Sequence, residues 1–170
     1  MTLSQMPLHP FIIQMLQHYT TEEPPNFTHW YGPWNSILTY LFPATDGFQV
    51  NPKLKKPDLI IEVSKVRYTE ARTLDFQVVL IEKFKSSQQW PKGEAQLFDR
   101  ICRQANSLLT TQSARQKLYW IAIMGPHWRY GIKEDDGLLE LPSLIPWHNT
   151  THDNASLDDL ETLAGLVRAL

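Results

Sequence analysis

The longest β-type run in this chain passes directly into a charged segment, and that transition limits what the chain can fold into. Residues Phe76–Phe84 are rich in valine and isoleucine, and the stretch from Val78 to Lys85 reads Val-Val-Leu-Ile-Glu-Lys-Phe-Lys. Burying a charge is costly unless the charge is paired or bound to a metal. Glu82 therefore either marks the place where a buried strand reaches solvent or belongs to a site at the end of that strand.

The rest of the chain alternates between helical and β-type patterns. Helical spacing of apolar residues predicts helices over residues 10–20, 33–41 and 94–109, and an N-cap signal at residues 156–159 predicts a last helix. Runs of β-type residues predict strands at 48–50, 58–63, 76–84, 118–124 and 128–132. This order predicts an α/β fold in which a mixed β-sheet is flanked by helices.

Length and composition favour one domain over residues 1–170. With 170 residues, 42% of them hydrophobic, the chain can bury one sizeable core, which we expect over about residues 30–133, followed by an acidic C-terminal extension over 134–170 with a terminal helix. No apolar run approaches the roughly 20 residues that span a membrane, and the N-terminus lacks a signal-peptide pattern. Together with a single cysteine, Cys102, these features predict an intracellular protein, of the cytoplasm or nucleus, with no membrane partner.

Charge is distributed unevenly along the chain although the formal net charge is only −2. Residues 53–103 carry eleven Lys and Arg against seven Asp and Glu, whereas residues 134–170 carry eight acids and a single cation, Arg168. Two solvated surfaces of opposite sign would explain this asymmetry. The alternative is that the middle of the chain binds a polyanion.

Two carboxylates at predicted strand ends form the candidate site. Asp58 opens one strand after Pro57, Glu82 lies near the end of another, and Gln96 follows early on the next helix. Two carboxylates brought together at strand ends can hold Mg²⁺, which prefers oxygen ligands. Such a metal can polarise a phosphoryl oxygen and activate a bound water, and a nearby lysine would stabilise the developing charge.

With these residues the chain resembles the PD-(D/E)xK nuclease superfamily. The matching residues are Pro57-Asp58, Glu82 within Leu-Ile-Glu-Lys, and Gln96 within Glu-Ala-Gln-Leu. Over roughly residues 30–133 the chain also resembles a group of small fungal proteins of this fold, through the segments 34–43, 56–62 and 119–129. The resemblance implies a restriction-endonuclease-like fold and a nuclease that uses Mg²⁺, or Mn²⁺, to hydrolyse nucleic-acid phosphodiesters. It makes Asp58 and Glu82 the metal ligands and places Gln96 at the edge of the site.

The lysine departs from the superfamily's pattern, in which a carboxylate and a lysine stand two residues apart on one face of a strand. Here Phe84 occupies that place, and Lys83 and Lys85 fall on the opposite face of a regular strand. A β-bulge after Glu82 would bring Lys85 round to complete the catalytic set. Otherwise the site is degenerate, and the chain is a non-catalytic module that binds nucleic acid or a protein partner.

Several further residues have competing interpretations. Arg100 or Arg103 could replace the missing lysine as a cation, although arginine is a poor proton-transfer group. Glu62 shares the alternation of Asp58 and is a candidate third acid of the site, although we expect it on an exposed face. Cys102 is expected to be a core thiol.

The histidines and tryptophans complete the set of candidates. His148 and His152 lie in a Pro/Asn/Thr loop with no cysteine cluster, so we expect no zinc site there. Two tryptophans, Trp34 and Trp120, fit core positions, whereas Trp90, Trp128 and Trp147 lie in or beside predicted loops and either pack or stack on bases.

Overall fold

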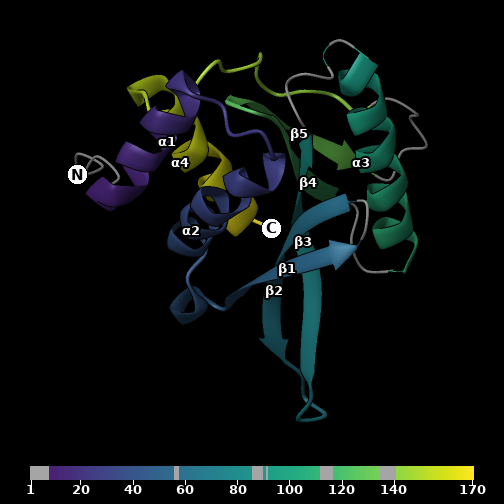
Figure 1. Cartoon of the computed structure of the whole chain (residues 1–170). Coiled ribbons are helices and arrows are strands. Elements are labelled where there is room, and N and C mark those ends of the chain that lie inside the picture. Colours follow the sequence, from purple (N-terminus) through teal and green to yellow (C-terminus); the bar gives the residue numbers. More distant parts are fainter. Residues whose placement is uncertain (1–7, 56–57, 86–89, 91, 112–116, 135–140) are drawn as a thin grey trace.

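The computed structural model describes residues 8–55, 58–85, 90, 92–111, 117–134 and 141–170, and for residues 27, 54, 55, 58, 59 and 82–85 it describes the backbone alone. Helices α1 (Pro10–Thr21), α2 (Tyr31–Leu41) and α4 (Asn154–Arg168) lie on one side of a β-sheet, and α3 (Lys92–Thr111) lies on the other (Figure 1). Two short 3₁₀ helices, η1 (Phe27–Trp30) and η2 (Ala44–Asp46), flank α2. Within the described residues, no helix combines the length and the apolar character needed to cross a membrane.

The sheet has five strands in chain order: β1 (Phe48–Lys55), β2 (Asp58–Tyr68), β3 (Leu74–Lys85), β4 (Lys117–Met124) and β5 (His127–Glu134). Neighbouring strands are antiparallel except β3 and β4, which are parallel. Parallel strands need a crossover connection, and α3 provides it. The predicted α/β fold with a mixed sheet flanked by helices is confirmed.

The two faces of the sheet bury different cores. The face toward α1, α2 and α4, here called the three-helix face, carries Ile61, Val63, Tyr119, Ile121, Ile123, Trp128 and Tyr130. The opposite α3 face carries Val78, Ile81, Leu118, Trp120, Ala122 and Met124. On β4 these residues alternate one by one between the two faces, as strand geometry requires. A strand buried on both faces reads as a continuous apolar run, which explains the pattern of residues 118–124.

Aromatic residues fill the core of the three-helix face. Trp30, Trp34 and Trp128 are fully buried, and the rings of Trp34 and Trp128 meet edge to face with centroids 5.5 Å apart. Trp128 was expected beside a loop, and its burial shows that it is a core residue. Its indole nitrogen donates to the Thr150 carbonyl at 2.9 Å, so the segment before α4 is tied to β5.

Helix α3 covers its face of the sheet through residues spaced three or four apart. Leu97, Ile101, Ala105 and Leu109 are all buried against it. A close approach occurs at Gly131 on β5, where a Cβ atom would lie 2.2 Å from Trp120 Cζ2 and 2.3 Å from the Pro142 carbonyl oxygen. Only glycine fits there, so the indole of Trp120 and the loop after β5 can pack directly on the backbone.

Element boundaries depart from the predicted ones at several places. Strands β1 and β2 are longer than expected, and the last helix begins at Asn154 rather than after Ser156. Its N-cap is Asp153, whose carboxylate accepts a hydrogen bond from the Ser156 amide at 2.7 Å. The extra length of β2 and β3 forms a hairpin that projects away from the helices (Figure 1).

Candidate functional site

The register of β2 and β3 determines how Asp58 and Glu82 are placed. Ile61 lies opposite Glu82, and Glu62 lies opposite Ile81. Ile61 belongs to the three-helix face, whereas Ile81 belongs to the α3 face. Because residues alternate between faces, Asp58 takes its place on the α3 face with Glu62, and Glu82 takes its place on the three-helix face. The register therefore does not bring the two predicted metal ligands together.

The β-bulge after Glu82 that would bring Lys85 onto the same face is not found in the described pairing. Pairing between β3 and β4 runs without a shift from Leu80 to Lys85, and the irregularity between β2 and β3 lies earlier, between Val63 and Ser64. Lys83 and Lys85 pair with Ala122 and Met124 and so stand on the α3 face. Both lysines thus share a face with Asp58 rather than with Glu82.

Distance along the strands also separates the two acids. Ile60 lies opposite Lys83, and the same register continued to the start of β2 puts Asp58 opposite Lys85, three residues from Glu82. Three residues of strand span about 10 Å along the backbone. The side chains of Asp58 and Glu82 lie outside the described residues, so the metal site itself remains a prediction.

Glu62 is the third acid of this region, and the expectation that it lies on an exposed face is wrong. It is 2% exposed. Its carboxylate pairs with Lys53 Nζ at 2.5 Å and accepts a hydrogen bond from Gln104 Nε2 at 2.9 Å. A buried charge is tolerated when it is paired in this way. Glu62 therefore links β1, β2 and α3, and about 13 Å of strand separates it from Asp58.

The polar residues of α3 occupy different surroundings. Gln96 is exposed near the start of the helix, and Arg103 forms an exposed ion pair with Asp99 at 2.8 Å. Cys102 is half-buried rather than fully in the core. Helix α3 also binds a cation from β5, because Glu94 pairs with Arg129.

Arg129 is enclosed by aromatic and acidic side chains. Its Nη2 lies 3.0 Å from Glu94 Oε1, and its guanidinium carbon lies 4.4 Å from the Phe98 ring centroid and 4.8 Å from that of Trp147. The Trp147 indole also donates to Glu94 Oε1, at 2.9 Å. A guanidinium is well suited to this position because it stacks on rings and bonds a carboxylate at the same time. We call these four residues the Arg129 cluster.

Burial is the main influence on the ionisation of Arg129. Desolvation lowers the pKa of the guanidinium, and the nearby Glu94 carboxylate partly opposes this shift. Arginine still keeps its charge at any physiological pH. Its Nε is buried and has no hydrogen-bond partner among the described residues. The cluster therefore holds a permanent, partly desolvated cation at the end of the sheet where α3 begins.

One register row connects this cation to the lysines of the sheet. Reading across the strands, Lys53 pairs with Ile60, Ile60 with Lys83, Lys83 with Ala122, and Ala122 with Arg129. We call this the cation row, because three of its five positions are basic.

The next row on the same face, two residues further along the strands, also contains basic residues. It contains Lys55, Asp58, Lys85, Met124 and His127 in the same order across the sheet. Lys53 and Arg129 are paired with acids. The other ionisable positions of the two rows, apart from His127, are three lysines, Lys55, Lys83 and Lys85, and one acid, Asp58. This end of the α3 face carries an excess of positive positions in a chain whose net charge is −2.

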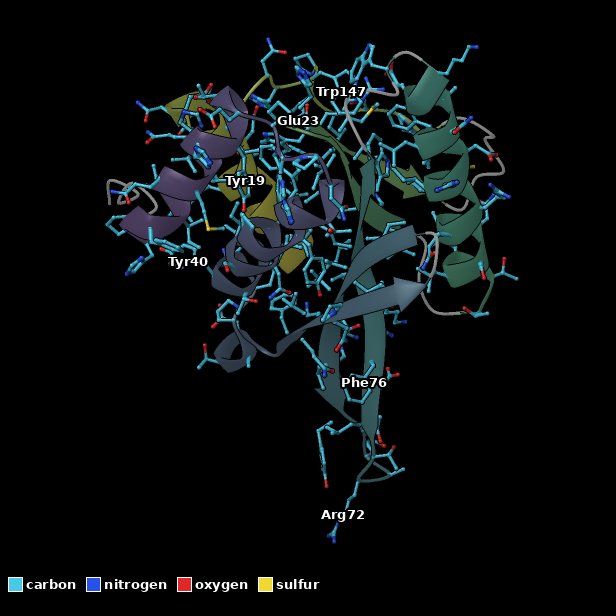
Figure 2. All side chains as sticks on the ribbon, in the orientation of Figure 1. Tyr19, Glu23, Tyr40, Arg72, Phe76 and Trp147 are labelled. Atoms are coloured by element: carbon cyan, nitrogen blue, oxygen red, sulfur yellow. The ribbon has the colours of Figure 1, made fainter. Side chains whose placement is uncertain are left out.

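Tryptophans border this end of the sheet. Trp90 packs against Trp147 and His127, with ring centroids 5.0 Å and 5.5 Å apart, and is 40% exposed. Figure 2 shows Trp147 at the end of the molecule where α3 begins. Trp90 and Trp147 thus pack with each other, and Trp90 still presents ring surface to solvent.

His148 and His152 have structural partners. His148 Nε2 lies 2.7 Å from Asp159 Oδ2, and its ring stacks on Trp128 at 4.7 Å. The His152 ring contacts the Thr150 hydroxyl at 2.7 Å. In the described part of the chain, no three His, Cys, Asp or Glu side chains converge in a group that could hold a metal ion.

Comparison with known proteins adds no relative: no protein-family model, no curated protein and no solved structure matches this chain. The residues and register of the site itself are therefore what bears on function. Sequence reasoning missed the Arg129 cluster because its members come from a helix, a strand and a loop. The one available signal was the tryptophan-rich composition of the segments around it.

Proposed function

We propose that this chain is a non-catalytic nucleic-acid-binding module built on a restriction-endonuclease-like sheet. The mixed sheet flanked by helices fits the fold that the sequence resemblance implies. The observation that carries the proposal is the register, which puts Lys83 and Lys85 on the same face as Asp58 and leaves Glu82 on the other. Basic positions gather on one face while the acids needed for a shared metal are divided.

The charge at this end of the sheet supports a polyanionic ligand. Phosphate contacts supply most of the affinity in sequence-independent nucleic-acid binding, and they come mainly from Lys and Arg. The two basic rows provide Lys53 and Lys55 from β1 and Lys83 and Lys85 from β3. These two strands are about 10 Å apart across the sheet, because β2 lies between them. The cation row extends across the whole sheet, from β1 to β5. A chain of phosphates can contact a row of this length, whereas a single small anion cannot, so nucleic acid is favoured.

Binding should be measured by fluorescence anisotropy of labelled single- and double-stranded DNA and RNA. We expect Lys85→Ala to weaken binding and to reduce the slope of log K against log salt by about 0.7 to 0.9, the value for one lost phosphate contact. Lys117→Ala is the matched control, because Lys117 lies at the opposite end of β4 from Met124, the neighbour of Lys85. Equal loss in both variants, or no binding by the unmodified protein, would contradict the proposal.

The second candidate is the metal-dependent phosphodiesterase implied by the resemblance. It is favoured by the register position of Asp58, which shares one face with two lysines. Glu62 cannot serve as its second acid in the arrangement described, because it is paired with Lys53 and Gln104. Cleavage of the same oligonucleotides in Mg²⁺ or Mn²⁺, lost in both Asp58→Asn and Glu82→Gln, would establish this candidate instead.

A further inference from the structure

The hairpin of β2 and β3 extends beyond the rest of the sheet as a two-stranded arm. Pairing of β1 with β2 ends at Phe48 and Lys65, and pairing of β3 with β4 begins at Leu80. Residues 66–76 thus have only each other as strand partners within the described sheet. Figure 1 shows this arm projecting away from all four helices. An isolated two-stranded hairpin is only marginally stable in water. An arm of this kind is therefore expected to serve a function, such as binding a partner.

One face of the arm is apolar and open. Val66 lies opposite Phe76 and Tyr68 lies opposite Leu74, so these four residues share a face, which we call the ring face. Tyr68, Leu74 and Phe76 are 70%, 57% and 48% exposed. Continuous exposed apolar surface of this kind marks a binding site more often than scattered exposed residues do. Tyr68 and Phe76 are diagonal neighbours across the two strands, at positions roughly 7 to 8 Å apart.

The charges of the arm are arranged around this face. Arg67 and Asp75 are directly opposite each other on the other face, so the ring face itself carries no carboxylate. Arg72 stands at the tip, at the far end of the arm from the helices (Figure 2). A partner that meets the ring face and the tip therefore encounters two aromatic rings, the Arg72 guanidinium and the exposed Glu70 carboxylate two residues before it.

Arg72 also adopts a backbone conformation that its side chain disfavours. Its φ is +59°, in the left-handed region where glycine is the usual residue. The turn is closed by the bond from the Arg72 amide to the Thr69 carbonyl, at 2.9 Å, and by a Thr69–Thr73 hydroxyl contact at 2.8 Å. A non-glycine residue there costs about 1 kcal/mol, and such local strain is found at binding sites more often than elsewhere.

The size of the ring face argues against a second copy of the chain as its occupant. Large side chains bury roughly 150 to 250 Å² each, so three that are about half exposed offer roughly 350 Å². Two copies in contact would bury about 700 Å², below the roughly 1,200 Å² of stable interfaces. A bilayer is disfavoured as well, because the tip residues 69–73 are polar or charged except for Ala71. Bases need far less area, since each one covers a single ring.

We propose that the ring face binds single-stranded nucleic acid, with bases stacked on Tyr68 and Phe76 and a phosphate bound by Arg72. This inference rests on the proposed nucleic-acid binding and assigns it a second contact surface. The ring face lies on the same side of the sheet as the cation row, about 26 Å along β2 from it. Aromatic rings presented on a sheet are a recurrent way of holding unpaired bases.

The test uses the full chain and a labelled single-stranded oligonucleotide of about 12 nucleotides, in RNA and DNA form. We expect Tyr68→Leu and Phe76→Leu each to weaken binding by roughly tenfold, and Tyr68→Phe to leave it within about twofold, because stacking needs the ring and not the hydroxyl. The slope of affinity against salt should stay unchanged in these variants, since no phosphate contact is removed. Tyr40→Leu is the control, because Tyr40 is 47% exposed on α2.

Arg72→Gly tests the tip separately from the rings. We expect a higher thermal midpoint, because glycine relieves the positive φ, together with weaker binding and a reduced salt slope. A tip with only a structural role would give the higher midpoint with no loss of binding, and that result would overturn the role of Arg72.

The remaining outcomes separate this inference from the proposed function. Unchanged binding in Tyr68→Leu and Phe76→Leu, with binding still weakened by Lys85→Ala, would overturn the stacking surface alone. No binding by the unmodified protein would overturn both. A concentration-dependent dimer in sedimentation, lost in Tyr68→Leu, would show that a second copy covers the ring face and would also overturn the inference.

Discussion

At the scale of single residues, Glu62 and Arg129 are each paired with an oppositely charged side chain from another element. Glu62 is 2% exposed and is held by Lys53 and Gln104, while Arg129 is held by Glu94 between two aromatic rings. Neither arrangement is visible in the sequence, because each joins residues from different elements. The alternation that made Glu62 a candidate was correct about its face but not about its exposure, because the sequence does not reveal that α3 covers that face.

The Glu62 site makes an asymmetric prediction. Lys53→Met should lower the free energy of unfolding by about 2 kcal/mol, because it leaves a buried carboxylate without its cation. Glu62→Gln should cost less, about 1 kcal/mol, because the half-exposed Lys53 can turn to water and the amide can still bond Gln104. The double variant should then be more stable than the sum of the two losses implies.

Urea unfolding of the two single variants and the double variant measures these differences. Lys117→Met is the control, because Lys117 forms an ion pair with Glu134 at 2.9 Å that is exposed on both sides. Hydrogen bonding to Glu134 raises the pKa of Lys117, but exposed pairs contribute little to stability. A loss in Lys117→Met equal to that in Lys53→Met would argue against a special role for the buried carboxylate.

The Arg129 cluster predicts that lysine cannot replace arginine. Arg129→Lys should lower the free energy of unfolding by about 2 kcal/mol, since lysine cannot stack on Phe98 and Trp147 while bonding Glu94. The fluorescence of Trp147 should change as well. Arg103→Lys, in an exposed pair with Asp99, should change stability by less than about 0.5 kcal/mol. Equal stabilities of the two variants would show that stacking is unimportant.

At the scale of secondary-structure elements, the predicted order of helices and strands is confirmed, whereas β1 and β2 are several residues longer than predicted. Periodicity located α1, α2, α3, β4 and β5 because each has a regular apolar pattern. It missed the second half of β2 and the first two residues of β3, because the apolar residues there, Val66, Tyr68 and Leu74, are few and surround a polar turn. A hairpin arm without a packing partner resembles an exposed loop in composition.

Gly131 predicts how tightly β5 packs on β4 and on the following loop. Gly131→Ala should cost about 3 kcal/mol, because the new methyl group would overlap Trp120 and the Pro142 carbonyl. Gly32→Ala on α2 is the matched control, because nothing lies within 4 Å of a Cβ there. Alanine should stabilise that helix by up to about 1 kcal/mol. Thermal melts of the two variants should therefore shift in opposite directions, and shifts of the same sign would contradict this packing.

At the scale of the whole molecule, the sheet separates two kinds of surface. The three-helix face is sealed by α1, α2 and α4, whereas the α3 face gathers the basic rows at one end and continues into the ring face of the arm at the other. The sequence could predict that residues 53–103 are basic. It could not predict which strand positions face each other, because register is set by pairing between distant segments.

The same reason explains why the sequence could not predict the faces of the sheet on which Asp58 and Glu82 lie. Asp58 and Glu82 were grouped into one site because both lie near strand ends. That pattern indicates their position along the strands but not the face of the sheet on which each lies. An irregularity in pairing between Val63 and Ser64 changes the phase of the two strands relative to each other. A shift of one residue moves a side chain to the opposite face, and no local pattern in the sequence marks where it occurs.

The most direct test of binding without cleavage is to follow one labelled single-stranded oligonucleotide in a sample that contains Mg²⁺, measuring binding and cleavage together. Anisotropy reports the complex, and a denaturing gel of that sample reports the length of the strand. A non-catalytic binding module should give a salt-sensitive complex with a full-length strand, and Lys85→Ala should bind more weakly. Shortened products that disappear in Asp58→Asn and Glu82→Gln would contradict this proposal, and would show that the two acids act together after all.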